Sequence, residues 1–180
     1  MKNILMTILV TVIISTVCLF SQETSKAPVH DGDGGIGVQM GGSSSIGGHA
    51  FYNLSEDMRL GLHFGFVFDG GAKNESSTTA LLFAPYFEMY FAKMKSFRPF
   101  IGAEFAINSG SYNSYNANTA QWETTTGTST DVNINVGGEW EATKTVALYG
   151  GFNFFNMALD PMRIKVGLGG VFMGIHWYMF

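Results

Sequence analysis

The stretch MRLGLHFGFVFD, Met58–Asp69, decides the fold class, because apolar and small or polar residues alternate strictly along it. One set of alternate positions holds only Met, Leu and Phe, while the other holds Arg59, His63 and Asp69 among small residues. Successive side chains of a β-strand point to opposite sides of the sheet, so a period of two predicts a strand. The glycines and aromatic residues disfavour a helix.

The same alternation recurs along the chain between polar connections. We expect strands at 35–42, 45–53, 58–69, 81–91, 98–108, 131–142, 146–156 and 163–180. Short polar turns alternate with longer connections rich in Gly, Asn, Ser and Thr, a pattern typical of up-and-down barrels that span a membrane. The sequence therefore predicts an all-β fold, an antiparallel up-and-down barrel of eight strands, or of ten if a terminal segment splits.

Composition indicates which face of the strands is buried. The chain is 46% hydrophobic but only 13% charged, against about 25% charged in soluble domains. A soluble lipocalin-like barrel, the alternative, needs a charged exterior that this chain lacks. Only helices and closed barrels satisfy every backbone group in hydrocarbon, and past the N-terminal segment no apolar run reaches the ~20 residues of a spanning helix. We therefore expect a membrane-spanning barrel with lipid outside and polar residues in the lumen.

The N-terminal segment is typical of a secretory signal peptide. Lys2 precedes an apolar run that ends at a small residue suited to cleavage; a transmembrane anchor is the alternative. Lipid attachment at Cys18, the single cysteine, is not expected because valine precedes it. The expected organisation is a signal peptide at 1–21, a flexible lead at 22–33 and a barrel domain at 34–180.

Charged residues are expected to meet inside the barrel. An eight-stranded barrel has an interior just wide enough for side chains to fill it. Charges in so narrow a space must be paired, because desolvating a lone ion costs several kcal/mol. The expected mixed-sign lumen network consists of Arg59, His63, Glu88, Arg98, Glu104 and Glu139, with Lys165 as a further candidate.

Aromatic residues flank the short turns and the C-terminus. They are Tyr52, Tyr90, Trp140 and Trp177. Barrels place such rings at the two membrane interfaces, whereas ordinary core packing is the alternative for any one of them. We expect these four residues to form an interfacial girdle.

The connection at 108–131 is the most distinctive expected loop. It is polar and carries Tyr112, Tyr115 and Trp122 at intervals. Loops held by a rigid scaffold often recognise partners, so these rings are candidates for binding an extracellular partner. A solvated spacer is the alternative.

The last ten residues, VFMGIHWYMF, resemble the C-terminal signature of bacterial outer-membrane β-barrel proteins. The terminal Phe180, together with Tyr178 and Phe172, matches that signature, while Gly174 and His176 depart from it. The overall plan resembles the small porin-family barrels of the OmpX, OmpA-barrel and OmpW type. This resemblance implies export to the outer membrane of a Gram-negative bacterium, contact with its lipid, and recognition of the last strand by the barrel-assembly machinery.

The facing of the last strand raises a conflict. If Tyr178 and Phe180 face lipid, His176 faces lipid too. Met173, Ile175 and Trp177 then turn inward. Either the lumen is apolar near its floor, or a bulge around 169–170 shifts the register.

The sequence favours a structural or surface-interaction role. The net charge of -4 without a basic patch argues against nucleic acid. We expect no catalytic, metal or cofactor site: His49 and His63 fit packed lumen residues, and HDGDGG (30–35) lacks the later glutamate of a calcium loop. A narrow porin-like channel for small or hydrophobic solutes is the alternative.

Overall fold

The computed structural model describes residues 32–69, 77–91, 94, 96–116, 119–159 and 162–179. The expected signal peptide and nearly all of the expected lead therefore lie outside the described residues. The described strands are β1 (Gly34–Gly41), β2 (Ile46–Ser55), β3 (Met58–Asp69), β4 (Ser77–Tyr90), β5 (Phe97–Asn116), β6 (Gln121–Glu141), β7 (Val146–Leu159) and β8 (Met162–Tyr178). No helix in this part of the chain is long and apolar enough to cross a membrane.

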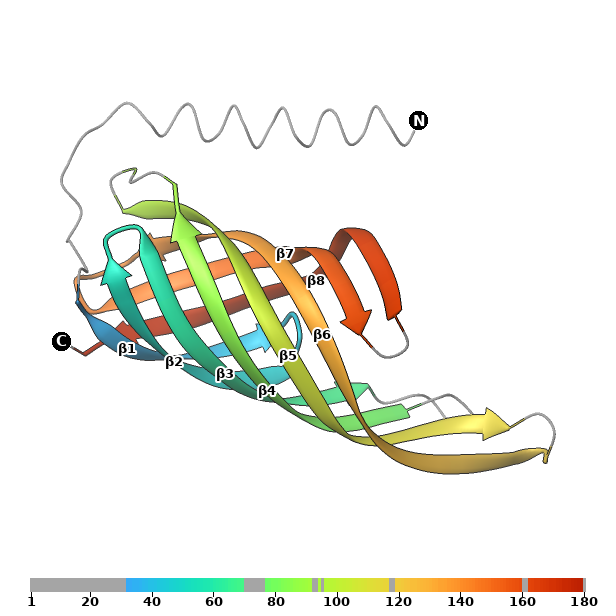
Figure 1. The fold of residues 1–180 in the computed structure, drawn as a ribbon. Helices are drawn as coiled ribbons and strands as arrows, with labels where there is room; N and C mark the ends of the chain where they lie inside the picture. The colour runs from blue at the N-terminus through green and yellow to red at the C-terminus, as the bar shows by residue number, and fades with distance from the viewer. Residues whose placement is uncertain are drawn as a thin grey trace.

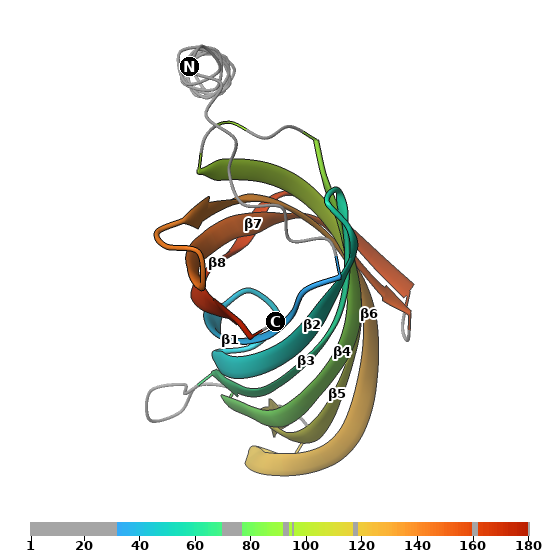
Figure 2. The same cartoon turned by 90° about the vertical axis from the view of Figure 1, so that its left-hand side faces the viewer.

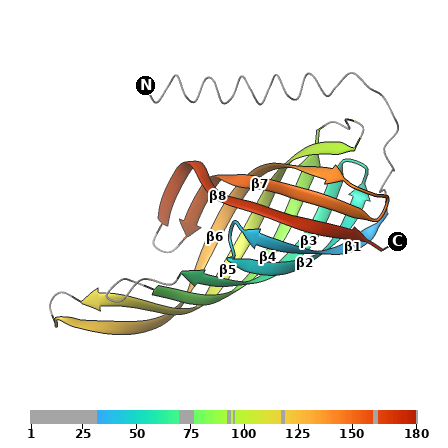
Figure 3. The same ribbon diagram turned by 180° about the vertical axis from the view of Figure 1, so that it is seen from behind.

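The eight strands form a closed barrel (Figure 1). Each strand pairs antiparallel with its neighbours in the chain, and β1 pairs with β8 from Gly35↔Tyr178 to Gly41↔Phe172. Figure 3 shows β1 and β8 side by side. The expected all-β fold, with eight antiparallel strands in up-and-down order, is confirmed.

The two ends of the barrel differ in their connections. The C-terminus lies at the same end as the β2–β3, β4–β5 and β6–β7 connections, and Figure 2 looks at the barrel from this end. We call it the turn end. The opposite end, which holds the other four connections, is called the loop end.

Alternation in β3 separates the outer wall from the lumen. Arg59 and His63 are almost completely buried, whereas Phe66 and Phe68 are 60% and 67% exposed. Other strands repeat this division, so large apolar side chains cover the outside of the barrel. They include Ile36, Val38, Ile46, Leu60, Phe64, Leu81, Phe83, Ile101, Phe105, Leu148, Val171 and Met173. Soluble monomers rarely expose so extensive an apolar surface, and hydrocarbon is the solvent that suits it.

Glycine makes room for rings in the lumen. A Cβ atom placed on Gly61 would lie 2.1 Å from the ring of Tyr86, on the neighbouring strand. No side chain fits at that position without moving the ring. At this level of the barrel a large side chain therefore fills the lumen by packing over bare backbone.

Bulges interrupt β7 and β8 towards the loop end. Asn153 pairs with Gly169 but Phe155 pairs with Val166, so extra residues are accommodated on both strands. Gly170 adopts a φ of +30°, a left-handed conformation that favours glycine. Of the two alternatives for the last strand, the bulge is therefore the one found, and it changes which alternate residues of β8 face the lumen.

The expected loop at 108–131 is instead mostly strand, which corrects the sequence-based prediction. β5 continues to Asn116 and β6 begins at Gln121, and the two pair throughout their length. The result is a hairpin that extends well beyond the other strands (Figure 1). β-Branched threonines supply the strand propensity, although the segment lacks the apolar alternation used to locate strands.

Candidate functional site

A buried ion cluster fills the lumen near the turn end. Glu139 of β6 accepts hydrogen bonds from Arg59 Nη1 at 2.9 Å and from Arg98 Nη2 at 2.7 Å. Arg59 also forms an ion pair with Glu88 at 3.4 Å, and Arg98 forms one with Glu141 at 3.6 Å. Four of the six residues expected in the lumen network thus lie together here, with Glu141 in addition.

Polar and aromatic neighbours complete the surroundings of the two arginines. Arg59 Nε donates to Asn53 Oδ1 at 2.9 Å, and its guanidinium lies 4.2 Å from the centre of the Phe51 ring. The guanidinium of Arg98 lies 4.2 Å from the centre of the Tyr90 ring. Cation–π contacts of this kind offset part of the cost of burying the charge. The structure therefore provides the partners that buried arginines require.

The polar residues of the last strand point into this cluster, although the sequence predicted that they face lipid. The hydroxyl of Tyr178 donates to Glu139 and accepts from Arg59 Nη2 at 2.6 Å. His176 Nδ1 donates to Glu139 as well. Both side chains are buried, whereas Trp177 is 38% exposed. The expectation that Tyr178 and His176 face lipid was wrong, because the bulge near Gly170 resets the alternation of β8 below it.

Tyr90 of the expected girdle and Phe172 of the expected C-terminal signature also face the lumen. Tyr90 was expected in the interfacial girdle but is buried, and its hydroxyl donates to Glu88 at 2.9 Å. It lies two residues after Glu88 on β4, so both side chains point to the same face. Phe172 is also buried, where it packs with Tyr149.

The other girdle candidates lie on the outer wall near the turn end. Tyr52 is 52% exposed, Trp140 is 47% exposed, and both lie on strands close to that end, as does Trp177. This position is compatible with a membrane interface.

A second polar cluster lies further toward the loop end. Glu104 accepts hydrogen bonds from the hydroxyl of Ser43 and from Asn133 Nδ2, the latter at 3.1 Å. Glu104 also pairs with His63 at 3.4 Å, and His63 Nε2 lies 3.2 Å from the Ser44 hydroxyl. Ser43 and Ser44 belong to the β1–β2 connection, so this short turn folds into the lumen and crosses it.

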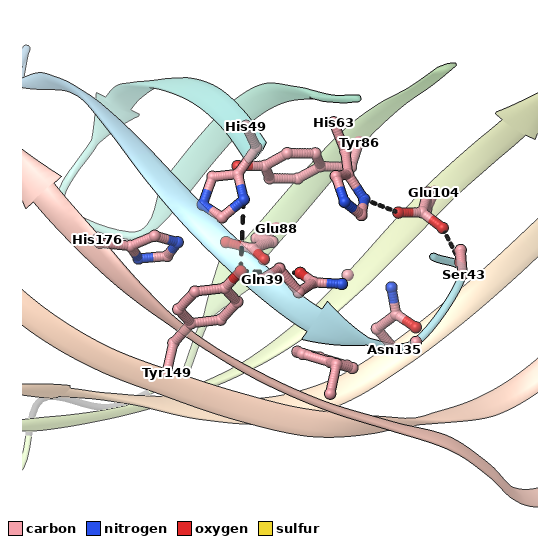
Figure 4. A pocket seen from close by; sticks show the side chains of 13 residues that line it. Gln39, Ser43, His49, His63, Tyr86, Glu88, Glu104, Asn135, Tyr149 and His176 are labelled. Atoms are coloured by element: carbon pink, nitrogen blue, oxygen red, sulfur yellow. Dashed lines mark hydrogen bonds and ion pairs between the residues drawn. The ribbon is translucent and has the colours of Figure 1, made fainter. Parts of the chain in front are cut away.

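Between the two clusters only a small cavity remains (Figure 4). His49, Tyr149 and His176 line it; the Tyr149 and His176 rings stack with centroids 3.9 Å apart. Tyr149 donates to Gln39 Oε1 at 2.8 Å. The cavity measures about 20 Å³, which is room for about one water molecule. The described side chains therefore leave little space in the middle of the lumen.

The protruding hairpin carries two of the three ring candidates for partner binding as a pair. Tyr115 and Trp122 face each other across the strands, with ring centroids 5.7 Å apart, and are 53% and 39% exposed. The side chain of Tyr112 lies outside the described residues, as does Phe180 of the expected assembly signal.

The sequence alone did not identify several residues that line the lumen. Tyr149 stands on the polar face of its strand and could have been found by alternation alone. Ser43 and Ser44 could not, because nothing local indicates that a turn enters the lumen. Within the described ranges, no group of three or more His, Cys, Asp or Glu residues could hold a metal ion.

Comparisons with solved structures agree with this geometry. The N-terminal β-barrel domain of Pseudomonas aeruginosa OprF superposes with a TM-score of 0.57 and 15% identity, over 83% of this chain and 98% of that one. The fold is that of an eight-stranded outer-membrane barrel. Neisserial surface protein A superposes with a TM-score of 0.54 and 15% identity, over 82% of this chain and 95% of that one. No family model matches the sequence, and no curated protein matches it.

Proposed function

We propose that this protein resides in the outer membrane of a Gram-negative bacterium and acts without catalysis, through its protruding β5–β6 hairpin, as a surface-interaction protein. The apolar outer wall supports contact with outer-membrane lipid. The hairpin extends from the loop end, opposite the C-terminus (Figure 1), and barrels of this architecture place their longer loops outside the cell. Its partner is an extended segment of another protein.

The free edge of β6 is the observation that carries this proposal. β7 pairs with β6 only as far as Asp131↔Ala158, so in the described part of the chain residues 121–130 have a strand partner on the β5 side alone. Such an edge presents unpaired N–H and C=O groups to which an extended peptide can add.

Protection of this edge is weak. Natural edge strands are commonly blunted by lysine, proline or bulges, and residues 121–130, QWETTTGTST, contain neither lysine nor proline. The β5–β6 ladder also runs without a register shift. The exposed Tyr115–Trp122 pair adds an aromatic contact near the tip, of the kind enriched at protein interfaces. An edge without a register shift, lysine or proline, lying beside two rings, suits recognition of a strand.

The filled lumen supports a non-conducting role. Arg59, Arg98 and Glu139 are all buried between the strands near the turn end, and the β1–β2 turn crosses the lumen above them. A narrow channel, the alternative function, has less support because the cavity between the two polar clusters measures only about 20 Å³.

We also propose that the barrel-assembly machinery reads the last strand through Phe172, Tyr178 and Phe180. In the folded barrel Phe172 and Tyr178 are buried. Recognition of these two rings must therefore precede closure of β8 against β1.

Binding of a labelled peptide that copies residues 121–130 tests the surface role, with purified barrel in detergent and fluorescence polarisation as the readout. We expect saturable binding, and its loss when residues 109–128 are replaced by a short Gly–Ser turn. Single prolines introduced at Thr124, Thr125 and Thr126 should weaken peptide binding at alternate positions only. The reason is that only every second N–H points to the free edge. Equal peptide binding with and without the hairpin would refute the proposal.

A further inference from the structure

Beyond the β1–β2 turn the lumen widens into a cavity of about 530 Å³, which we call the vestibule. Its polar lining includes Asn108 of β5, Asp131 and Asn133 of β6, Asn153 and Asn156 of β7, Lys165 of β8, and Ser43 of the β1–β2 turn. Its volume falls within the ~300–1,000 Å³ of small-molecule sites. The vestibule is separate from the free edge of the hairpin, so its role does not depend on the proposed surface function.

Strand register gathers these side chains into neighbouring rows. Asn133 pairs with Asn156, and Asn156 pairs with Lys165. Asp131 lies two residues before Asn133 and therefore faces the same side of β6. The bulges in β7 and β8 are what bring Asn156 and Lys165 to the lumen face at this height.

Two opposite charges line the vestibule without meeting. Asp131 accepts hydrogen bonds from Asn108 Nδ2 at 3.3 Å and from Asn156 Nδ2 at 3.5 Å. Neither Asp131 nor Lys165 forms an ion pair with any residue that the structure describes. A carboxylate and an ammonium group held apart in one cavity can each take an opposite charge from a ligand.

The amide groups add unpaired acceptors. Asp131 can only accept, so the NH₂ group of Asn108 must point toward it and the Oδ1 atom must point away. This Asn108 Oδ1 is buried without a hydrogen-bond partner, as is Asn153 Oδ1. In the vestibule the unsatisfied buried side-chain atoms of described residues are both oxygens, so the site favours a ligand that brings hydrogen-bond donors.

We propose that the vestibule binds a small zwitterion that carries an ammonium group and a carboxylate. The ammonium group lies against Asp131, and the carboxylate pairs with Lys165. A neutral sugar would satisfy the free acceptors but leave both charges unpaired. A simple cation would pair with Asp131 but make no use of Lys165, whose exposed side chain also lines the vestibule. A zwitterion engages both charges at once.

The test uses linear ω-amino acids of increasing length, from glycine to 6-aminohexanoate, titrated into the purified barrel in detergent by calorimetry. Because the two charges are fixed on different strands, affinity should peak at one chain length. Butylammonium and butyrate, which each carry one charge, should bind about tenfold more weakly than the best zwitterion. Equal binding of butylammonium, saturable binding of sucrose in place of the zwitterions, or no saturable binding at any length would overturn the proposal.

Variants separate recognition from a structural role. Asp131→Asn and Lys165→Gln should each weaken binding of the best zwitterion about tenfold. The charge-swapped double variant, Asp131→Lys with Lys165→Asp, should restore binding in the reverse orientation. Lys144→Gln, which removes a charge from the exposed β6–β7 turn, is the control and should bind as the unmodified protein does. Unchanged affinity in both Asp131→Asn and Lys165→Gln would contradict the assignment.

Discussion

The hydroxyl of Tyr178 on β8 donates a hydrogen bond to Glu139 on β6, although β7 lies between these two strands. The same Glu139 binds Arg59 of β3 and Arg98 of β5. Because β8 also closes the barrel against β1, this one carboxylate connects the closing strand to the opposite part of the wall. Closure and the buried ion cluster are therefore expected to form together.

Glu139→Gln should be strongly destabilising. The change removes the negative charge that two buried arginines share, and breaking a buried ion pair from one side costs about 3–5 kcal/mol. Urea unfolding of the barrel in lipid vesicles measures the loss. Glu123→Gln on the exposed hairpin is the matched control, with an expected change within about 0.5 kcal/mol. Similar stabilities of the two variants would contradict the central role of Glu139.

Tyr178→Phe and Trp177→Phe test which of two adjacent rings faces the lumen. The first removes a hydroxyl that is bonded to charged groups, at an expected cost of about 1.5–3 kcal/mol. The second keeps an apolar ring on the outer wall and should cost less than about 1 kcal/mol. The comparison is made by unfolding both variants in the same vesicles, and the reverse order of cost would mean that the register of β8 is different.

Glu104→Arg should lower the melting temperature of the barrel in detergent. It places a positive charge beside His63 and removes the acceptor that binds the β1–β2 turn through Ser43. Heat-dependent gel migration follows the melting. Glu123→Arg reverses a charge on the hairpin and serves as the control; if both variants melt with the unmodified protein, the second lumen cluster does not stabilise the barrel.

Deletion of Phe180 should slow assembly in cells without lowering the stability of barrel refolded from urea. A signal read by the assembly machinery affects the rate of insertion, whereas a structural residue affects the folded state. Pulse-chase heat modifiability reports the first quantity and urea unfolding reports the second. Normal assembly kinetics in the deletion variant would remove the signal role.

The protein should show no steady conductance in a planar bilayer. Buried side chains occupy the lumen near the turn end, and the cavity between the two polar clusters measures about 20 Å³. A general porin inserted under the same conditions is the positive control. Steady single-channel currents from the unmodified protein would favour the channel alternative.

Alternation predicted the strands whose environment is uniform along their length. In β3 every second residue faces the apolar exterior, so a period of two was enough to place Arg59 and His63 on the lumen face. It failed for β8, where a bulge near Gly170 exchanges the two faces of the strand. Between that bulge and the C-terminus, the residues expected to face lipid face the lumen. It also failed for the hairpin within 108–131: residues 121–126 of β6 are exposed on both faces and so have no apolar period.

The amino-acid sequence by itself determined the barrel, because strand period, low charge and the need to satisfy every backbone group in hydrocarbon allow little else. Only the tertiary structure decided which charged side chains meet. Arg59, Arg98 and Glu139 come from three strands, and their contacts depend on strand register, bulges and barrel closure. These properties are set by pairing between distant segments, and no local stretch of sequence contains them.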